Sequence, residues 1–350
     1  MARIPLVYCC EILDSQRIPI TAKDREEGPY PYYGANGVQD YVADYIFDDD
    51  LVLLAEDGGN FGSKERPIAY RVSGKCWVNN HAHVLKPKAG TDVDYLCYAL
   101  MFYDTSGLVN GATRQKLTQA AMRQMTIPLN SIEDQRMIVR KIKAFEQIKK
   151  HRKEQIDALD ELIKARFVEM FGNPITNTKE LETMSLKDVL VLKAGDFTTA
   201  SDISDEPNEI NKYPCYGGNG IRGYVAEYNQ EGEYSLIGRQ GALSGNVQYA
   251  KGQFKNTEHA LLVTPIIEMN SVWLNHLLIN LDLKRYQTGA AQPGLSVKNL
   301  QGIQIITVPI DEQESFADFV QQVDKSKVVA QKSLDEAQLL FDSLMQKYFG

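Results

Sequence analysis

The chain has 350 residues, of which 43% are hydrophobic and 24% are charged, and this balance is typical of a globular protein. Its net charge of −8 argues mildly against a nucleic-acid partner, because phosphate binding requires Lys and Arg, although a local basic face matters more than the sum. The sequence shows neither a signal-peptide pattern nor an apolar stretch long enough to span a membrane, so we expect a cytoplasmic protein with no membrane partner.

The cysteines argue against both a disulfide framework and a zinc site. Their number is odd, their spacing is irregular and no Cys-x-x-Cys pair occurs, so we expect small buried apolar side chains in a reducing compartment. The five are Cys9, Cys10, Cys76, Cys97 and Cys215.

Residues 1–132 are expected to form an α+β domain with a mainly antiparallel sheet. Short apolar runs such as 51–54 and 77–78 lie between Gly, Asn and Pro turns, which is typical of strands, whereas 93–103 predicts a single helix. The Gly-rich run 58–62 lacks the pattern of a dinucleotide-binding loop and predicts a turn.

Residues 133–173 predict a long helix that runs from about Glu133 to Phe171 and ends before Asn173-Pro174. Its apolar residues recur in steps of three and four, the spacing of a coiled-coil seam. The seam consists of Ile138, Ile142, Phe145, Ile156, Leu159, Ile163 and Met170.

Residues 174–311 predict a second domain of the same kind, with a strand at 260–263 and a helix at 272–281. Residues 312–350 predict a second long helix, from about Glu312 to Phe349. The apolar seam of this helix consists of Phe316, Val320, Val323, Ala330, Leu334, Ala337, Phe341, Leu344 and Tyr348.

The two halves are copies of one another. Residues 30–37 (YPYYGANG) recur 183 positions later as YPCYGGNG, and the pairs Gly58/Gly241 and Gly62/Gly245 keep that offset. Further along, His81/His259 and Gln135/Gln313 lie 178 positions apart, and each half ends in Phe-Gly. Because the repeat is about half the chain long, it indicates a duplicated domain and not a solenoid. The lead-in to the first half is short, and we expect either its first edge strand or its lead-in loop to be trimmed.

The two seams share one register, including a polar interruption at Lys149 and Lys327. Each helix could cover its own domain, but thirty-eight residues form a rod of roughly 57 Å, longer than a domain of this size can bury. We therefore expect the helices to pair with each other. The predicted fold is α+β, with two pseudo-repeated recognition domains joined and spaced by a pair of long antiparallel helices in a coiled coil.

This organisation resembles the specificity subunit of type I restriction-modification systems. The resemblance rests on the doubled motif at 30–37 and 213–220, on the segment 11–17 before the first copy and on the paired long helices ending in Phe-Gly, and it covers essentially the whole chain. It implies two target recognition domains that each read half of a split double-stranded DNA sequence, with the helices fixing the gap between the halves.

The resemblance also implies partners. Two adenine methyltransferase subunits, which use S-adenosylmethionine, would dock on the helices, and motor-nuclease subunits that use ATP and Mg²⁺ would complete the enzyme. The specificity subunit itself binds no cofactor and is not an enzyme. In agreement, we find no P-loop, no adenine methyltransferase motif and no His-Glu-x-x-His in the sequence.

His81 and His83, with Cys76 nearby, could suggest a metal, but only His81 has a counterpart in the second half, and we predict no metal site. A structural role or a DNA-facing role for His81 both remain open. The tyrosines shared by the two halves could stack on bases, although core packing under the Gly-Asn-Gly turn is favoured.

Residues that read bases should lie in loops where the two copies differ, since each domain reads its own sequence. Each candidate could equally be a solvated loop side chain. The candidates are Asn60, Ser63, Lys64, Arg66, Arg71, Lys75, Asn79, Asn80, Arg114, Gln115, Lys116, Arg239, Gln240, Ser244, Asn246, Gln248, Lys251, Lys255, Asn256, Gln287 and Gln292. An alternative function is a helical scaffold that joins two protein-binding domains without DNA, which the acidic balance favours slightly.

Overall fold

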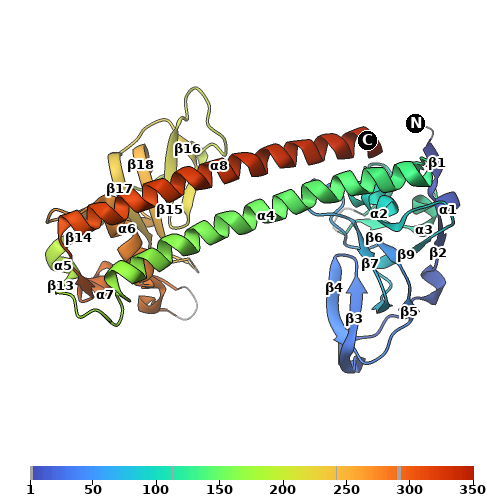
Figure 1. Ribbon diagram of the computed structural model, residues 1–350, viewed down its shortest axis with the longest axis horizontal. Coiled ribbons are helices and arrows are strands. Elements are labelled where there is room, and N and C mark those ends of the chain that lie inside the picture. Colours follow the sequence, from blue (N-terminus) through green and yellow to red (C-terminus); the bar gives the residue numbers. More distant parts are fainter. Residues whose placement is uncertain (1–2, 112–113, 242, 290–292) are drawn as a thin grey trace. The chain divides into compact units, whose positions relative to one another are not determined.

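The computed structural model describes residues 3–111, 114–241, 243–289 and 293–350. The chain forms two compact units, Met1–Arg152 with Lys332–Gly350 (unit 1) and Lys153–Gln331 (unit 2). Each unit contains a β-rich domain and parts of the long helices α4 (Ile132–Phe171) and α8 (Ile310–Phe349) (Figure 1). No helix in the described part of the chain is long and apolar enough to cross a membrane.

Unit 1 is built on two four-stranded sheets, with strand orders β2-β9-β6-β7 and β4-β3-β8-β5. All neighbours in these sheets pair antiparallel except β3 and β8, which are parallel. The strands are β2 (Cys10–Ile12), β3 (Glu27–Gly34), β4 (Gly37–Val42), β5 (Phe47–Asp48), β6 (Leu51–Ala55), β7 (Ala69–Val72), β8 (Lys75–Val78) and β9 (Ala82–Pro87).

Unit 2 contains one six-stranded sheet of order β14-β19-β17-β18-β15-β16. Here β17 spans the equivalents of both β5 and β6, and β18 spans those of β7 and β8, so one sheet forms where unit 1 has two. The strands are β14 (Leu190–Ala194), β15 (Tyr213–Gly217), β16 (Gly220–Val225), β17 (Gln230–Gly238), β18 (Val247–Asn256) and β19 (Ala260–Pro265). The predicted α+β class with mainly antiparallel sheets is confirmed.

Each unit also has a small two-stranded sheet, which pairs β1 (Arg3–Pro5) with β12 (Thr126–Pro128) and β13 (Thr183–Ser185) with β20 (Gln304–Ile306). Because β1 is the counterpart of β13, the first edge strand is present, and of the two expected alternatives a trimmed strand is the wrong one. Two pairs of short helices flank these strands. Helix α1 (Leu6–Cys9) follows β1 as α5 (Leu186–Val189) follows β13, and α3 (Gln119–Met122) precedes β12 as α7 (Val297–Gln301) precedes β20.

The strand register shows where the two copies differ in length. Leu53 faces Val84 as Leu236 faces Leu262, which places β6 at an offset of 183 from β17. Val72 faces Leu51 as Ala250 faces Tyr234, so β7 already has the offset of 178. The five extra residues of the first copy therefore lie between Gly62 and Ala69, among residues 63–68.

Helices α2 (Val93–Met101) and α6 (Ser271–Asn280) occupy equivalent places and lie within a residue or two of their predicted bounds. Figure 1 shows α2 beside β6 and β7. The side chain of Asp92 accepts hydrogen bonds from the first turn of α2, and Asn270 does the same for α6, so each helix is capped at its N-terminus.

A buried glutamine ties each long helix to its domain. Gln135 at the start of α4 accepts from the Asp92 backbone N–H at 2.9 Å and donates to the carbonyl oxygens of Gly90 and Asn130, each at 2.9 Å. Gln313 at the start of α8 accepts from the Asn270 N–H at 2.9 Å in the same way. The two glutamines occupy equivalent positions of the repeat because each connects the start of a long helix to its domain by hydrogen bonds.

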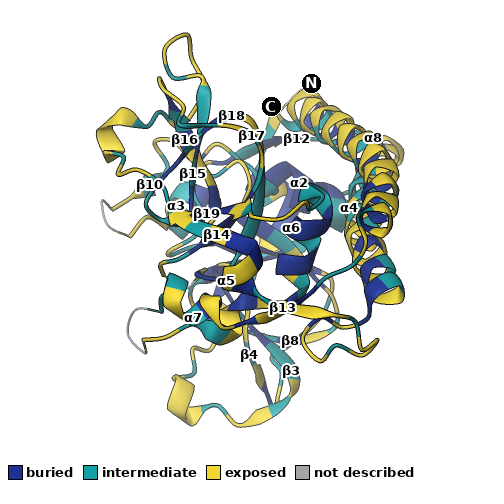
Figure 2. Ribbon diagram, turned by 90° about the vertical axis from the view of Figure 1, so that its left-hand side faces the viewer, coloured by how far each residue is buried: buried dark blue, intermediate teal, exposed yellow. Residues whose placement is uncertain are grey.

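The long helices pack antiparallel within each unit. In unit 1 the Arg152 Nε donates to the Ser333 hydroxyl at 3.1 Å, and in unit 2 the Lys327 ammonium donates to Asp160 at 2.6 Å. Figure 2 shows one exposed and one buried side along each helix. The predicted seam residues Ile138, Ile142, Ile163, Phe316, Val320, Val323 and Phe341 are buried, and Phe145, Ile156, Leu159, Leu334 and Leu344 are half-buried.

The seam departs from the prediction near the end of α4. Phe167, which we did not assign to the seam, is fully buried, whereas the predicted Met170 is only half-buried. The ring of Phe167 lies 5.1 Å from that of Phe171 and 5.4 Å from that of Phe316 in edge-on contacts. Phe171 in turn packs against Trp273 of α6, so the aromatic side chains at the end of α4 face the domain core of unit 2.

We predict that replacing Gln135 with Leu lowers the stability of unit 1. The substitution leaves the Asp92 N–H and two carbonyl oxygens without their partner in a buried site, which costs about 1–3 kcal/mol of unfolding free energy. Urea unfolding measures the loss. The matched control is Gln147→Leu on an exposed position of the same helix, where the change stays within about 0.5 kcal/mol. Equal effects of the two substitutions would contradict the role of the buried amide.

Candidate nucleic-acid interface

Loops from distant parts of the sequence meet at one edge of unit 1. The Asn36 amide in the β3–β4 turn donates to the Gly58 carbonyl at 3.0 Å, and the Gly58 N–H donates to the Gln115 carbonyl at 3.1 Å. The Glu56 N–H reaches the His81 carbonyl at 2.9 Å. We call residues 35–37, 56–62, 79–81 and 114–117 the loop edge of unit 1; it includes β11 (Lys116–Leu117), the partner of β10 (Val109–Asn110).

The same edge is built in unit 2. The Arg239 N–H donates to the His259 carbonyl at 3.0 Å, and the Leu295 N–H donates to the Arg239 carbonyl at 2.9 Å. The Gly241 N–H donates to the Pro293 carbonyl at 2.9 Å. We call residues 217–220, 239–241, 243–245, 257–259, 287–289 and 293–295 the loop edge of unit 2. Its backbone skeleton repeats that of unit 1.

The side chains on the loop edge of unit 1 are charged and paired. Arg114 Nε lies 2.6 Å from Asp57 Oδ1, and Lys116 Nζ lies 3.2 Å from Glu56 Oε1. The second oxygen of Asp57 lies 3.4 Å from His81 Nδ1. These pairs largely cancel the local charge, so this edge offers donors and acceptors without a strong net field.

The loop edge of unit 2 carries amides in corresponding places. Gln240, the counterpart of Asp57, lies with Oε1 2.7 Å from His259 Nδ1. The Asn246 amide donates to Asn219 at 3.2 Å, and the Gln287 amide donates to the Ser244 carbonyl. The two copies therefore present different hydrogen-bonding groups on one skeleton.

The structure brings only part of the predicted set to these edges. Asn60, Asn80, Arg114, Gln115, Lys116, Arg239, Gln240 and Gln287 lie on them, with Lys64 and Arg66 exposed and Ser63 and Asn246 half-buried in the adjoining loops. Gln248 is half-buried in β18. Gln292 lies outside the described residues.

Four predicted cations lie elsewhere and have partners of their own. Arg71 pairs with Asp50 at 2.9 Å and with Asp94 at 3.0 Å, and Lys75 lies over the Tyr45 ring at 4.4 Å. In unit 2, Lys251 pairs with Glu233 and Lys255 with Asp196, both at 3.6 Å. Each of these cations therefore has a contact partner within the protein.

Three predicted base readers are buried and do not reach the surface of the loop edges. Asn79 is 3% exposed, and it donates to Gln39 and accepts from the His81 N–H, which fixes the turn before β9. Ser244 and Asn256 are 0% and 1% exposed. A polar residue type between strands does not reveal whether its hydrogen bonds go to the protein itself or to a partner.

Both copies share polar residues on these edges, and of these sequence reasoning missed the two asparagines while it left the role of the histidine open. Asn36 and Asn219 are exposed at the turns, and His81 and His259 are half-buried where the loops meet. The signal that could have found them is the repeat itself, because it preserves these polar residues next to loop glycines.

A buried ion-pair network supports the loop edge of unit 1 from below. His83 is fully buried, with Nδ1 2.7 Å from Asp14 Oδ2 and Nε2 2.8 Å from the Leu117 carbonyl. Both ring nitrogens of His83 therefore face oxygen atoms of the protein. The Arg17 guanidinium donates to Glu56 at 2.6 Å, so Glu56 is held from inside as well as by Lys116.

The network contains three groups with metal-ligand chemistry, Asp14, Glu56 and His83, whose ligand atoms lie within 4.8 Å of one another. Neither ring nitrogen of His83 is directed at open space, and Arg17 already neutralises Glu56. A cation entering this site would have to displace those donors. The geometry therefore fits an ion-pair network better than a metal centre.

Hydrogen bonding controls the ionisation of Asp14. Burial, the largest single influence, raises the pKa of this carboxyl, but hydrogen bonds from His83, Gln119 and the Val84 N–H outweigh it and hold the pKa below its usual range. The second copy places Leu261 where the first has His83, so this polar support belongs to unit 1 alone.

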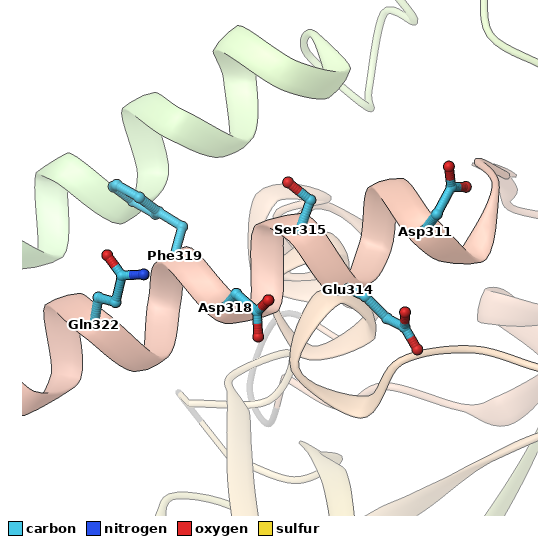
Figure 3. Close-up of a pocket in the computed structure, with 6 residues that line it drawn as sticks. All are labelled: Asp311, Glu314, Ser315, Asp318, Phe319 and Gln322. Carbon is cyan, nitrogen blue, oxygen red and sulfur yellow. The ribbon is translucent and has the colours of Figure 1, made fainter.

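The first turns of α8 carry an acidic depression. Figure 3 shows Asp311, Glu314 and Asp318 along one side of the helix, with Phe319 pointing toward the neighbouring helix. In α4, 178 residues earlier, the equivalents of Glu314 and Asp318 are the exposed Arg136 and Arg140, whereas the equivalent of Asp311 is the exposed Glu133. The two helix starts therefore differ in the sign of charge at two of these three positions.

Comparison with known proteins agrees with the fold and the duplication. The family model for the type I restriction modification DNA specificity domain matches the chain twice, at residues 9–158 and 178–337. The chain therefore belongs to the family of type I restriction-modification specificity proteins.

Similar proteins include the specificity subunit of the type I restriction enzyme EcoprrI from Escherichia coli, 43% identical over 140 residues. They also include the putative type I specificity subunit S.HindORF215P from Haemophilus influenzae, 36% identical over 141 residues. Each match covers 40% of this chain, and the matched stretches span 35% and 36% of the two relatives, about a third of their length.

Two solved structures share the fold over nearly the whole chain. The S subunit of the type I system from M. genitalium superposes with a TM-score of 0.63 at 17% identity, and the match covers 100% of this chain and 96% of that one. A chain from a study of complex assembly and conformational transition in the type I system gives 0.57 at 16% identity, covering 99% of this chain and 97% of that one.

We predict that Asp14 stabilises unit 1 in a pH-dependent way. Because its folded pKa lies below the unfolded value near 3.8, its contribution is fully present above about pH 4 and is lost as the pH falls further. Asp14→Asn should lower the unfolding free energy at pH 7 by about 1–3 kcal/mol. The difference from the parent protein should shrink in urea titrations below pH 4. Asp44→Asn, at an exposed position, is the control, and a difference that grows with acidity would contradict the prediction.

Proposed function

We propose that the chain is the DNA-specificity subunit of a type I restriction-modification complex, with each loop edge reading one half of a bipartite target. The observation that carries the proposal is that the two loop edges share the same backbone hydrogen bonds but present different side chains. Asp57, Arg114 and Lys116 stand on the loop edge of unit 1, whereas Gln240 and Gln287 stand on that of unit 2. Bases are distinguished by such donor and acceptor patterns, so the two units would read different sequences.

The same charges argue that the chain does not bind DNA strongly by itself. Bulk affinity for DNA comes from unpaired Lys and Arg on phosphates. Here the net charge is −8, and the cations Arg114 and Lys116 are paired with carboxylates. Partner subunits would have to supply most of the phosphate contacts, while this chain supplies sequence preference.

We assign the outward sides of the long helices to protein partners. The carboxylates of Asp311, Glu314 and Asp318 repel phosphate, so this side of α8 suits a protein with basic groups. The partners would be two adenine methyltransferase subunits that carry S-adenosylmethionine, joined by motor-nuclease subunits that use ATP and Mg²⁺. This chain would bind no cofactor and carry out no chemical step.

We expect the isolated chain to bind DNA weakly and the complex with its methyltransferase subunits to bind a bipartite site tightly. The site would first be identified by sequencing methylated adenines in cells that carry the system. Affinities would then be compared at fixed salt for that site and for a scrambled duplex of the same composition. Equal affinity of the complex for both duplexes would refute the proposal and favour a scaffold function.

We expect the helix pair to set the gap between the half-sites. Seven residues inserted into α4 after Arg152, with seven inserted into α8 after Gln331, preserve the seam register and lengthen the pair by roughly 10 Å. The preferred gap should then grow by about three base pairs, with both half-sites unchanged. Seven residues inserted into the exposed loop 205–211 serve as the control. An unchanged gap would show that the helices do not set it.

A further inference from the structure

One exposed arginine on the loop edge of unit 1 is held in place before any partner arrives. The Arg114 side chain is 60% exposed, yet its Nε lies 2.6 Å from Asp57 Oδ1. The guanidinium lies over Gly58, since a Cβ built at that glycine would be 3.3 Å from Nε and 3.6 Å from Nη2. Gly58 has a φ of +69°, which favours glycine and leaves this surface open.

The contact with Asp57 occupies one edge of the guanidinium. It is made through Nε, and within the described residues the terminal Nη groups have no acceptor. The Asp57 side chain is only 22% exposed, and its other oxygen lies 3.4 Å from His81 Nδ1. Two parallel N–H donors therefore remain on a side chain whose position is already restricted.

We propose that Arg114 reads a guanine in the half-site bound by unit 1 and that Asp57 is the residue that positions it; this inference rests on the proposed function. Guanine presents two acceptors, O6 and N7, in the major groove, and two Nη donors of arginine match that pair. Asp57 and Gly58 hold the arginine in a restricted conformation, which reduces the entropy lost on binding.

Charge distinguishes this role from a contact with phosphate. The Arg114–Asp57 pair is neutral overall, so a phosphate would gain little from the arginine and would be repelled by the nearby carboxylate. A base edge carries no net charge and leaves the ion pair intact. The pair therefore suits base recognition, whereas the exposed Lys64 and Arg66, which have no ion-pair partner in the described chain, suit phosphate.

The second copy has no equivalent of the Asp57 carboxylate that positions Arg114. At the position of Asp57 it has Gln240, which contacts His259, and at the position of Gly58 it has Gly241, beside which a Cβ would meet no described atom within 4 Å. The counterpart of Arg114 is Gln292, outside the described residues. The inference is therefore confined to the half-site of unit 1.

The test measures base discrimination by the assembled methyltransferase complex. A panel of duplexes carries every single base-pair substitution across both half-sites, and affinities are measured at one salt concentration. Arg114→Ala should lose about 5- to 150-fold of discrimination at one G·C pair of one half-site, the range expected for a bidentate contact. The other half-site should be unchanged. Lys86→Ala, which removes an ion pair with Asp49 elsewhere in unit 1, should leave the profile intact.

Asp57→Asn tests the positioning role by a second route. It should weaken discrimination at the same base pair and at no other, and the double variant should lose less than the product of the two single losses. Uniform weakening on all duplexes with a shallower salt dependence would show a phosphate contact and overturn the inference. An unchanged profile, or a change at an A·T pair, would overturn it too. A parent complex with no sequence preference would instead overturn the proposed function.

Discussion

The structure depends on one packing constraint, which is that a forty-residue helix with a narrow apolar seam cannot bury that seam on its own domain. Helices α4 and α8 meet the constraint by packing antiparallel. As a result, the core of each unit contains the start of one long helix and the end of the other. Phe171 at the end of α4 packs against Trp273 and Phe316 in unit 2, and Phe349 at the end of α8 packs against Tyr95 in unit 1.

This arrangement explains which repeated residues are structural. Gln135 and Gln313 fix the helix starts, while Thr118 and Ser296 cap equivalent short helices. The tyrosine pairs Tyr30–Tyr45 and Tyr213–Tyr228 have ring centroids 5.0 Å apart in both units. Such residues maintain a common skeleton, and the variable loop side chains are placed on it.

Much of the fold follows from sequence periodicity, because the duplication and the two seams are visible as regular patterns. Phe167 shows the limit of that approach, since which of several apolar residues faces the core depends on the neighbouring domain. The loop edges were predictable only in part. Asn79 and Arg114 look alike as polar loop residues, but one is buried and the other exposed, and this difference arises from contacts with residues 40 and 57 positions away. The five-residue difference in length could be counted from the offsets, but only the strand register places it among residues 63–68.

A final consequence concerns the order of the segments along the chain. The guanidinium of Arg3 donates to the carbonyl oxygens of Phe349 and Gly350, each at 3.2 Å, so the first described strand and the last helix meet in unit 1. The order of the segments is domain, helix, domain and helix, and the end of the last helix lies next to the start of the first domain. A gene that was rearranged to begin in the connection after α4, with Gly350 joined to the present start, would encode the same contacts. A circular permutation at this connection should therefore leave the fold unchanged.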